Sequence, residues 1–133
     1  MARMMAAIKK FEDLDIWQSA RGLTRVIYEI TSRNEFAHEF SLKDQMQRAA
    51  VSILSNISEG FERDSNKEFL TFLSYAKGSC GELRSQLYVA LDQHLVDENE
   101  FKRIYEKAIE LSKMLSSFMS YLRHCGIKGN KYK

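Results

Sequence analysis

Residues 69–91 read FLTFLSYAKGSCGELRSQLYVAL, and their apolar side chains recur at spacings of three and four residues. The recurring positions are Phe69, Phe72, Leu73, Ala76, Cys80, Leu83, Leu87 and Leu91. This spacing places the side chains on one face of an α-helix, whereas a strand alternates every second residue. Together with the capping-box pattern at Ser65–Glu68, the stretch predicts a helix over residues 66–93.

Three further segments carry the same periodicity on either side of this helix. The sequence predicts helices over residues 14–32, 42–59 and 98–124, with a loop at residues 33–40. Four helices with short connections fold most simply as an antiparallel up-down bundle. We therefore predict an all-α four-helix bundle in which residues 1–133 form a single domain.

Local signals mark the predicted helix ends. Asp13 is the predicted N-cap of the first helix, and Ser41–Asp44 and Asp97–Glu100 fit the capping-box pattern. Gly60 is predicted to adopt the left-handed conformation that ends the second helix.

The composition is that of a globular protein. Of the 133 residues, 44% are hydrophobic and 29% are charged, proline is absent, and no apolar run approaches the ~20 residues that span a bilayer. We predict a cytoplasmic protein that does not enter a membrane. Cys80 and Cys125 lie within helical patterns, which favours buried free thiols over a disulfide.

Positive charge is concentrated at the two ends of the chain. Residues 1–12 carry a net charge of +2 and residues 123–133 carry +4, which leaves −4 on residues 13–122 of a chain whose total is +2. We predict that the segments 1–12 and 126–133 are flexible and basic. An anionic partner should therefore contact the ends; the predicted nucleic-acid-binding residues are Lys9, Lys10, Arg123, Lys128, Lys131 and Lys133.

Some apolar side chains fall outside the core-facing stripes. Trp17 and Tyr28 share a second face of the first helix, and Leu70 and Tyr88 share one on the third. A single core needs an apolar arc of only roughly 100° per helix. The extra faces predict that the protein assembles with copies of itself, with these four residues in the interface.

Small and polar residues line the middle two helices. We predict that Ala49, Ser52 and Ser55 face Ser74, Gly78 and Gly81, so that the two backbones approach closely. Among the polar residues of the second helix, Arg48 is predicted to pair with Glu82 and Glu59 with Lys67 across the helices. Such pairs fix helix register and do not indicate catalysis.

No catalytic or metal-binding pattern is present. His38, His94 and His124 never stand at metal-ligand spacing, neither cysteine has a catalytic partner, and no phosphate-binding glycine loop occurs. We predict that the protein is not an enzyme and binds no metal or cofactor.

Three blocks of sequence carry a family resemblance. They are KFEDLDIWQSA at 10–20, QRAAVSILSNISEGF at 47–61 and KEFLTFLSYAKGS at 67–79, followed by Glu82 and Leu83. In this order they resemble the four-helix-bundle proteins encoded by intervening sequences in bacterial 23S ribosomal RNA genes. The accessory variability proteins of diversity-generating retroelements are similar.

The resemblance implies assembly as well as fold. It implies a closed ring of five copies, and by similarity to the retroelement proteins an association with nucleic acid and a reverse transcriptase. Leu54 stands where the family usually has proline, so the second helix is expected to be straighter. The residues that match the family's signature imply a structural role, as does Glu82; they are Arg48, Asn56, Glu59, Gly60, Arg63, Lys77 and Gly78.

Two function classes follow. The first is a non-enzymatic oligomeric scaffold that binds structured RNA or DNA, alone or with a partner protein. The alternative is a protein–protein adaptor that touches no nucleic acid. The basic ends favour the first class, because an adaptor does not need them.

Overall fold

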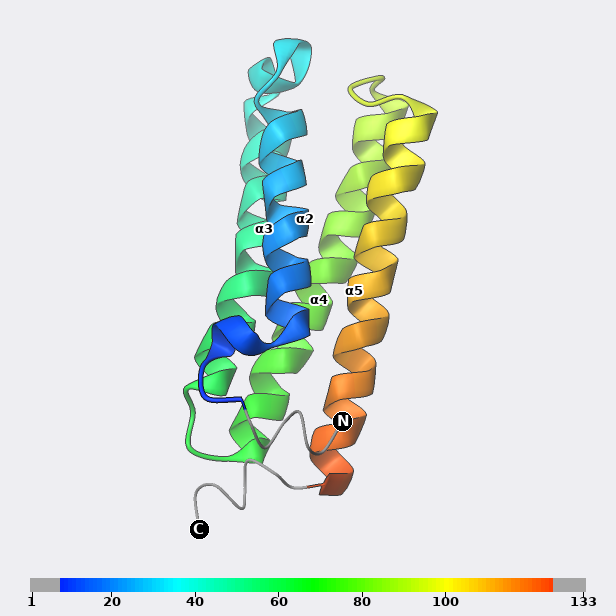
Figure 1. Cartoon of the computed structure of the whole chain (residues 1–133). Helices are drawn as coiled ribbons and strands as arrows, with labels where there is room; N and C mark the ends of the chain where they lie inside the picture. The colour runs from blue at the N-terminus through cyan, green and yellow to red at the C-terminus, as the bar shows by residue number, and fades with distance from the viewer. Residues whose placement is uncertain (1–7, 126–133) are drawn as a thin grey trace.

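The computed structural model describes residues 8–125, which form four long α-helices and two short 3₁₀-helices (Figure 1). In chain order these are η1 (Phe11–Asp13), α2 (Asp15–Thr31), η2 (Asn34–His38), α3 (Phe40–Phe61), α4 (Asn66–Asp92) and α5 (Glu98–Cys125). Each predicted long helix agrees with the observed one to within two residues at either end. The apolar periodicity therefore located all four.

The helices form an antiparallel up-down bundle. Consecutive helices pack side by side, and α2 also contacts α5, which closes the bundle (Figure 1). This confirms the predicted fold class. α3 passes through Leu54 as one uninterrupted helix, as expected for a chain that lacks the family's proline there.

The core is built from the predicted stripes. All four helices bury their apolar faces in one cluster, and the largest fully buried side chains include Ile27, Met46, Ile53, Ile57, Phe69, Leu73, Leu83, Leu87, Ile104 and Leu111. The segment predicted as a loop at 33–40 contributes as well, because η2 buries the ring of Phe36.

Two capping predictions are confirmed. The Glu68 N–H donates to Ser65 Oγ at 3.2 Å, and the Glu100 N–H donates to Asp97 Oδ1 at 2.8 Å. In the second box Glu100 Oε1 also accepts from the Asp97 N–H at 3.3 Å, so both backbone donors are satisfied.

Two other capping predictions are wrong. The N-cap of α2 is Leu14, not Asp13, and no side chain caps the start of this helix through a hydrogen bond. α3 begins at Phe40, because the Lys43 N–H already donates to the Glu39 carbonyl at 2.9 Å. Ser41 therefore lies inside the first turn, past the position that a capping hydroxyl must occupy.

The predicted role of Gly60 is also wrong. α3 continues through Gly60 to Phe61, and the Glu62 N–H donates to the Ser58 carbonyl at 3.1 Å. Continuing the helix places the Phe61 ring in the core. Gly60 is thus a buried helical residue whose missing side chain allows α4 to approach.

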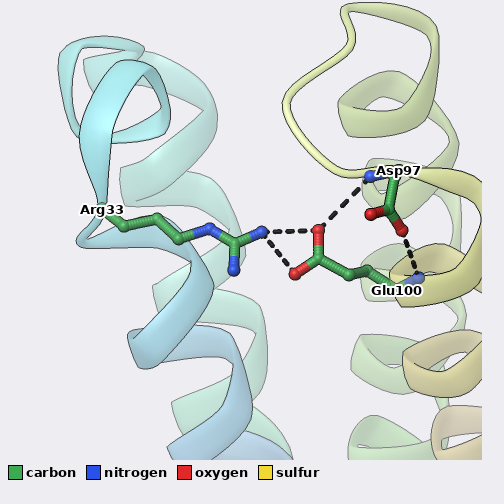
Figure 2. Close-up of polar contacts among 3 residues, drawn as sticks. All are labelled: Arg33, Asp97 and Glu100. Atoms are coloured by element: carbon green, nitrogen blue, oxygen red, sulfur yellow. Dashed lines mark hydrogen bonds and ion pairs between the residues drawn. The ribbon is translucent and has the colours of Figure 1, made fainter.

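At the end of the bundle that holds η2, a charged contact joins the turn between α2 and η2 to α5. Arg33 Nη2 lies 2.6 Å from Glu100 Oε1, and Glu100 is the same residue that caps the start of α5 with Asp97 (Figure 2). One carboxylate therefore both caps the N-terminus of α5 and contacts the turn that follows α2.

Candidate nucleic-acid and subunit interfaces

The predicted basic residues begin at one end of the bundle. Lys9 and Lys10 are exposed just before η1, and Arg123 is exposed in the last turn of α5. Figure 1 places these segments at the end that also holds the α3–α4 connection. At that end Asn66 Nδ2 donates to the Leu122 carbonyl at 3.3 Å, which ties the start of α4 to the end of α5. Lys128, Lys131 and Lys133 lie outside the described residues, as do most of the predicted flexible segments 1–12 and 126–133.

Two further cations, Arg63 and Lys67, lie in and next to the α3–α4 connection at this same end. Both are exposed, and the Arg63 guanidinium carbon lies 4.7 Å from the centroid of the Phe72 ring. They were not among the predicted nucleic-acid-binding residues, because that prediction rested on the net charge of the two chain ends alone. The only sequence signal at Arg63 is its match to the family signature.

The charge of this end is mixed over the described residues. Arg3 and the three lysines after residue 125 are outside them, so residues 8–125 carry a net charge of −2 in a chain of +2. Acidic residues Glu12, Glu62 and Asp64 stand beside the basic ones. The candidate interface therefore depends on the terminal segments for its excess positive charge.

The four predicted interface residues differ in exposure. Tyr28 and Tyr88 are 42% and 49% exposed. Trp17 and Leu70 are partly buried against the core, and Trp17 Nε1 donates to Ser58 Oγ on α3 at 2.9 Å. The ring of Phe11 lies 5.2 Å from that of Trp17. Tyr28 and Tyr88 thus offer more free area to a second copy than Trp17 and Leu70 do.

Tyr88 belongs to an aromatic cluster with Phe101 and Tyr105. Its ring centroid lies 4.8 Å from that of Phe101 and 5.4 Å from that of Tyr105, and the Phe101 and Tyr105 rings stack at 5.2 Å. A hydrogen bond between the two tyrosine hydroxyls raises the pKa of Tyr88, because it favours the protonated phenol. Of these three rings on α4 and α5, only Tyr88 is exposed, while Phe101 and Tyr105 are partly buried.

The predicted interhelical ion pairs are not formed. Arg48 Nε lies 2.9 Å from Asp44 Oδ2 one turn earlier on α3, and Glu59 pairs with Arg63 at 3.7 Å. All four side chains are well exposed. Within residues 8–125, Arg48 therefore pairs along its own helix and not with Glu82. These pairs lie on the solvent side of α3 and contribute little to stability.

The close seam between α3 and α4 is offset from its prediction. Ser52 Oγ lies 2.8 Å from Ser79 Oγ, and Asn56 Nδ2 donates to the Ser52 carbonyl at 2.8 Å and to Ser52 Oγ at 3.0 Å. Gly78 has open space where a Cβ would stand. A shift of one residue turns a helix by about 100°, which moves Gly78 away from the seam.

Within residues 8–125, no group of three metal-binding side chains comes together, and no helix is both long and apolar enough to cross a membrane. Cys80 is a buried free thiol whose Sγ donates to the Ala108 carbonyl at 3.1 Å. The Cys125 side chain lies outside the described residues.

The architecture and these surfaces define an all-α, four-helix-bundle protein with exposed cations and carboxylates at one end and an aromatic cluster on α4 and α5. Residues 12–117 match the sequence profile of the 23S rRNA-intervening sequence protein family, and the chain belongs to that family. This confirms the predicted membership of the 23S rRNA-intervening sequence protein family, whereas the similarity to the retroelement accessory proteins stays a prediction.

A solved structure has the same fold. The chain is similar to the crystal structure of a protein of unknown function from the S23 ribosomal protein family of Bacteroides thetaiotaomicron VPI-5482, with a TM-score of 0.71 and 22% sequence identity. The alignment covers 78% of this chain and 97% of that one. At this identity the likeness establishes the fold alone. No curated protein matches the chain in sequence.

Proposed function

We propose that the protein is a non-enzymatic scaffold that assembles into a pentameric ring and binds structured RNA or DNA through its basic end, alone or with a partner such as a reverse transcriptase. The observation that carries this proposal is the convergence of Lys9, Lys10 and Arg123 at one end of the bundle. Lys128, Lys131 and Lys133 follow α5 in the sequence.

Assembly is what turns this end into a binding surface. One subunit is a weak polyanion binder, because residues 8–125 carry a net charge of −2. A ring with its subunits in parallel gathers five copies of each basic segment on one face. Binding is then driven by counterion release at phosphates, so it is steeply salt-dependent and weakly sequence-specific.

The aromatic cluster Tyr88, Phe101 and Tyr105 is the proposed centre of the subunit contact, with Tyr28 as a second contribution. Exposed aromatic rings are common anchors of protein interfaces. The number five comes from the family resemblance. Light scattering at micromolar concentration should therefore give a mass five times that of the 15.5 kDa chain; a monomer mass contradicts assembly, and a dimer mass contradicts the ring.

The nucleic-acid proposal is tested by removing tail charges from the full chain. The variant with Lys128, Lys131 and Lys133 each changed to glutamine is titrated with an RNA hairpin and a DNA duplex over a salt series. We expect weaker binding and a shallower salt dependence, by about 0.9 in the logarithmic slope for each DNA phosphate that the variant no longer neutralises.

A matched control removes the same number of charges from the helices. Arg25, Arg103 and Lys107 are exposed on α2 and α5, and their glutamine variants should bind nearly as tightly as the unchanged chain. Equal losses in both triple variants contradict a site at the basic end. If the unchanged chain binds neither probe at low salt, nucleic-acid binding is refuted.

One observation favours the alternative, a protein–protein adaptor. Val51, Tyr75 and Val89 are exposed apolar side chains on α3 and α4, outside the aromatic cluster. They add an apolar surface that a partner protein could cover. An oligomer that binds no polyanion, with or without its tail lysines, supports this second function.

A further inference from the structure

A half-open apolar pocket lies between the start of α2 and the middle of α5. Its volume is about 360 Å³, within the range of small-molecule sites, which begins at roughly 300 Å³. Leu14, Ile16 and Phe118 form its buried floor, and the partly buried Ile8 and Met114 form its walls. Its interior suits an apolar group.

The rim of the pocket is acidic. Asp13, Asp15 and Glu110 are exposed around the opening, against the single cation Lys113. Within residues 8–125, none of the three carboxylates forms an ion pair. An apolar floor beneath unpaired carboxylates favours a ligand that is apolar at one end and positively charged at the other.

The position of Glu110 shows that helix capping does not account for every carboxylate on the rim. Asp13 and Asp15 flank the N-terminus of α2, where a carboxylate is favourable whatever the pocket binds. Glu110 stands in the middle of α5, far from either helix end, and lines the pocket with Met114 one turn later. The charge of Glu110 therefore does not stabilise either end of a helix.

We propose that this pocket binds an amphipathic cation, an apolar body of side-chain size that carries an ammonium or guanidinium group. The ligand has two possible sources, a free amine or a lysine beside an apolar residue in the chain's own C-terminal segment, such as Ile127–Lys128. Both present the same chemistry, and the proposal does not depend on nucleic-acid binding.

The test uses the full chain with methyl-labelled methionine, titrated with n-octylamine, n-octanol and n-octanoate. These probes share one apolar body and differ in charge. The Met114 methyl should shift in a saturable way, while the core residues Met46 and Met119, which do not line the pocket, should not. We expect octylamine to bind about tenfold more tightly than octanoate. Equal affinity for the two, or an unperturbed Met114, overturns the proposal.

A matched pair of variants tests the rim. Glu110→Gln should weaken octylamine about threefold and leave octanol unchanged. Glu106→Gln removes an exposed carboxylate one turn earlier on α5, outside the pocket, and should change neither. Because both residues are exposed, both variants should fold. If Glu106→Gln weakens octylamine as much as Glu110→Gln does, the preference is a general charge effect and the proposal is wrong.

The source of the ligand is distinguished by the glutamine variant of Lys128, Lys131 and Lys133. If the chain's own segment fills the pocket, this variant should shift the Met114 signal before any probe is added and bind octylamine more tightly. If an external amine is the ligand, both the signal and the affinity should match the unchanged chain.

Discussion

Gly60 of α3 and Phe72 of α4 approach so closely that a Cβ at residue 60 would lie 2.8 Å from the Cβ of Phe72. It would also lie 2.8 Å from Cδ1 of Phe69 and 3.3 Å from the Phe69 carbonyl oxygen. Two of these three atoms belong to the backbone or stand next to it, so they cannot rotate away. The glycine therefore sets how closely α3 and α4 pack near their connection.

Gly60→Ala should consequently destabilise the protein. Overpacking costs roughly 1–3 kcal/mol, and the better helix propensity of alanine returns about 1 kcal/mol. Gly78→Ala is the matched control, because Gly78 is helical and free of close neighbours. It should stabilise the protein by up to about 1 kcal/mol. Urea unfolding measures both, and equal effects would show that Gly60 is not a close-packing position.

The contrast between these glycines shows what the sequence can predict. The apolar stripes of α4 and α5 each contain many residues, so misassigning one position did not change the predicted helices or the predicted core. The residues of the α3–α4 seam depend instead on the exact rotation of α4 about its axis. The seam contains Ser79 and not the neighbouring Gly78, so the predicted contact residue faces outward. A family signature marked Gly60 as structural but did not show why.

Side-chain partners were less predictable still. Arg48 can reach Asp44 within its own turn, and this local pair formed in place of the predicted one with Glu82. A partner four residues away is always within reach, whereas one on another helix depends on helix rotation. The connection that holds Arg63 was more predictable, because an up-down bundle necessarily brings its middle connection to the end where the first long helix begins and the last one finishes.

Removing the Glu100 carboxylate should cost more than removing Arg33. Glu100→Ala removes both the ion pair with Arg33 and the cap on the Asp97 N–H, for a total of about 1–2 kcal/mol. Arg33→Met removes only the ion pair, whose side chains are 42% and 22% exposed, so about 0.2–1 kcal/mol is expected.

A double-mutant cycle separates these two contributions. The coupling between Arg33 and Glu100 should exceed that of the more exposed Arg48–Asp44 pair, which should be about 0.3–0.5 kcal/mol. The Arg33–Glu100 coupling should also fall in high salt. If the two couplings are equal, the Arg33–Glu100 contact is an ordinary surface pair.

Cys80 should resist chemical labelling and make stability depend on alkaline pH. Burial raises the pKa of its thiol, because the thiolate would lose its hydration. As the pH rises above the ordinary thiol pKa, the unfolded chain therefore releases a proton that the native chain retains, and stability falls.

Iodoacetamide labelling of a Cys125→Ser variant checks the first effect. Cys80 should stay unmodified in the native protein and react quickly in urea. Urea unfolding from about pH 8 to 10 checks the second, with Cys80→Ser as the control that removes the thiol and should flatten the slope. Rapid native labelling at pH 8 would contradict a buried thiol of raised pKa.

Tyr88→Ser and Trp17→Phe should separate assembly from folding. Tyr88 is 49% exposed in the aromatic cluster, so its loss should lower the mass measured by light scattering while the far-UV circular dichroism spectrum stays helical.

Trp17 instead donates to Ser58 Oγ and packs on Phe11. Trp17→Phe should lower the free energy of unfolding by about 0.5–1.5 kcal/mol through the missing hydrogen bond and leave the assembled mass unchanged. The reverse pattern, assembly abolished in Trp17→Phe and kept in Tyr88→Ser, would move the subunit interface from the α4–α5 cluster to the α2–α3 side of the bundle.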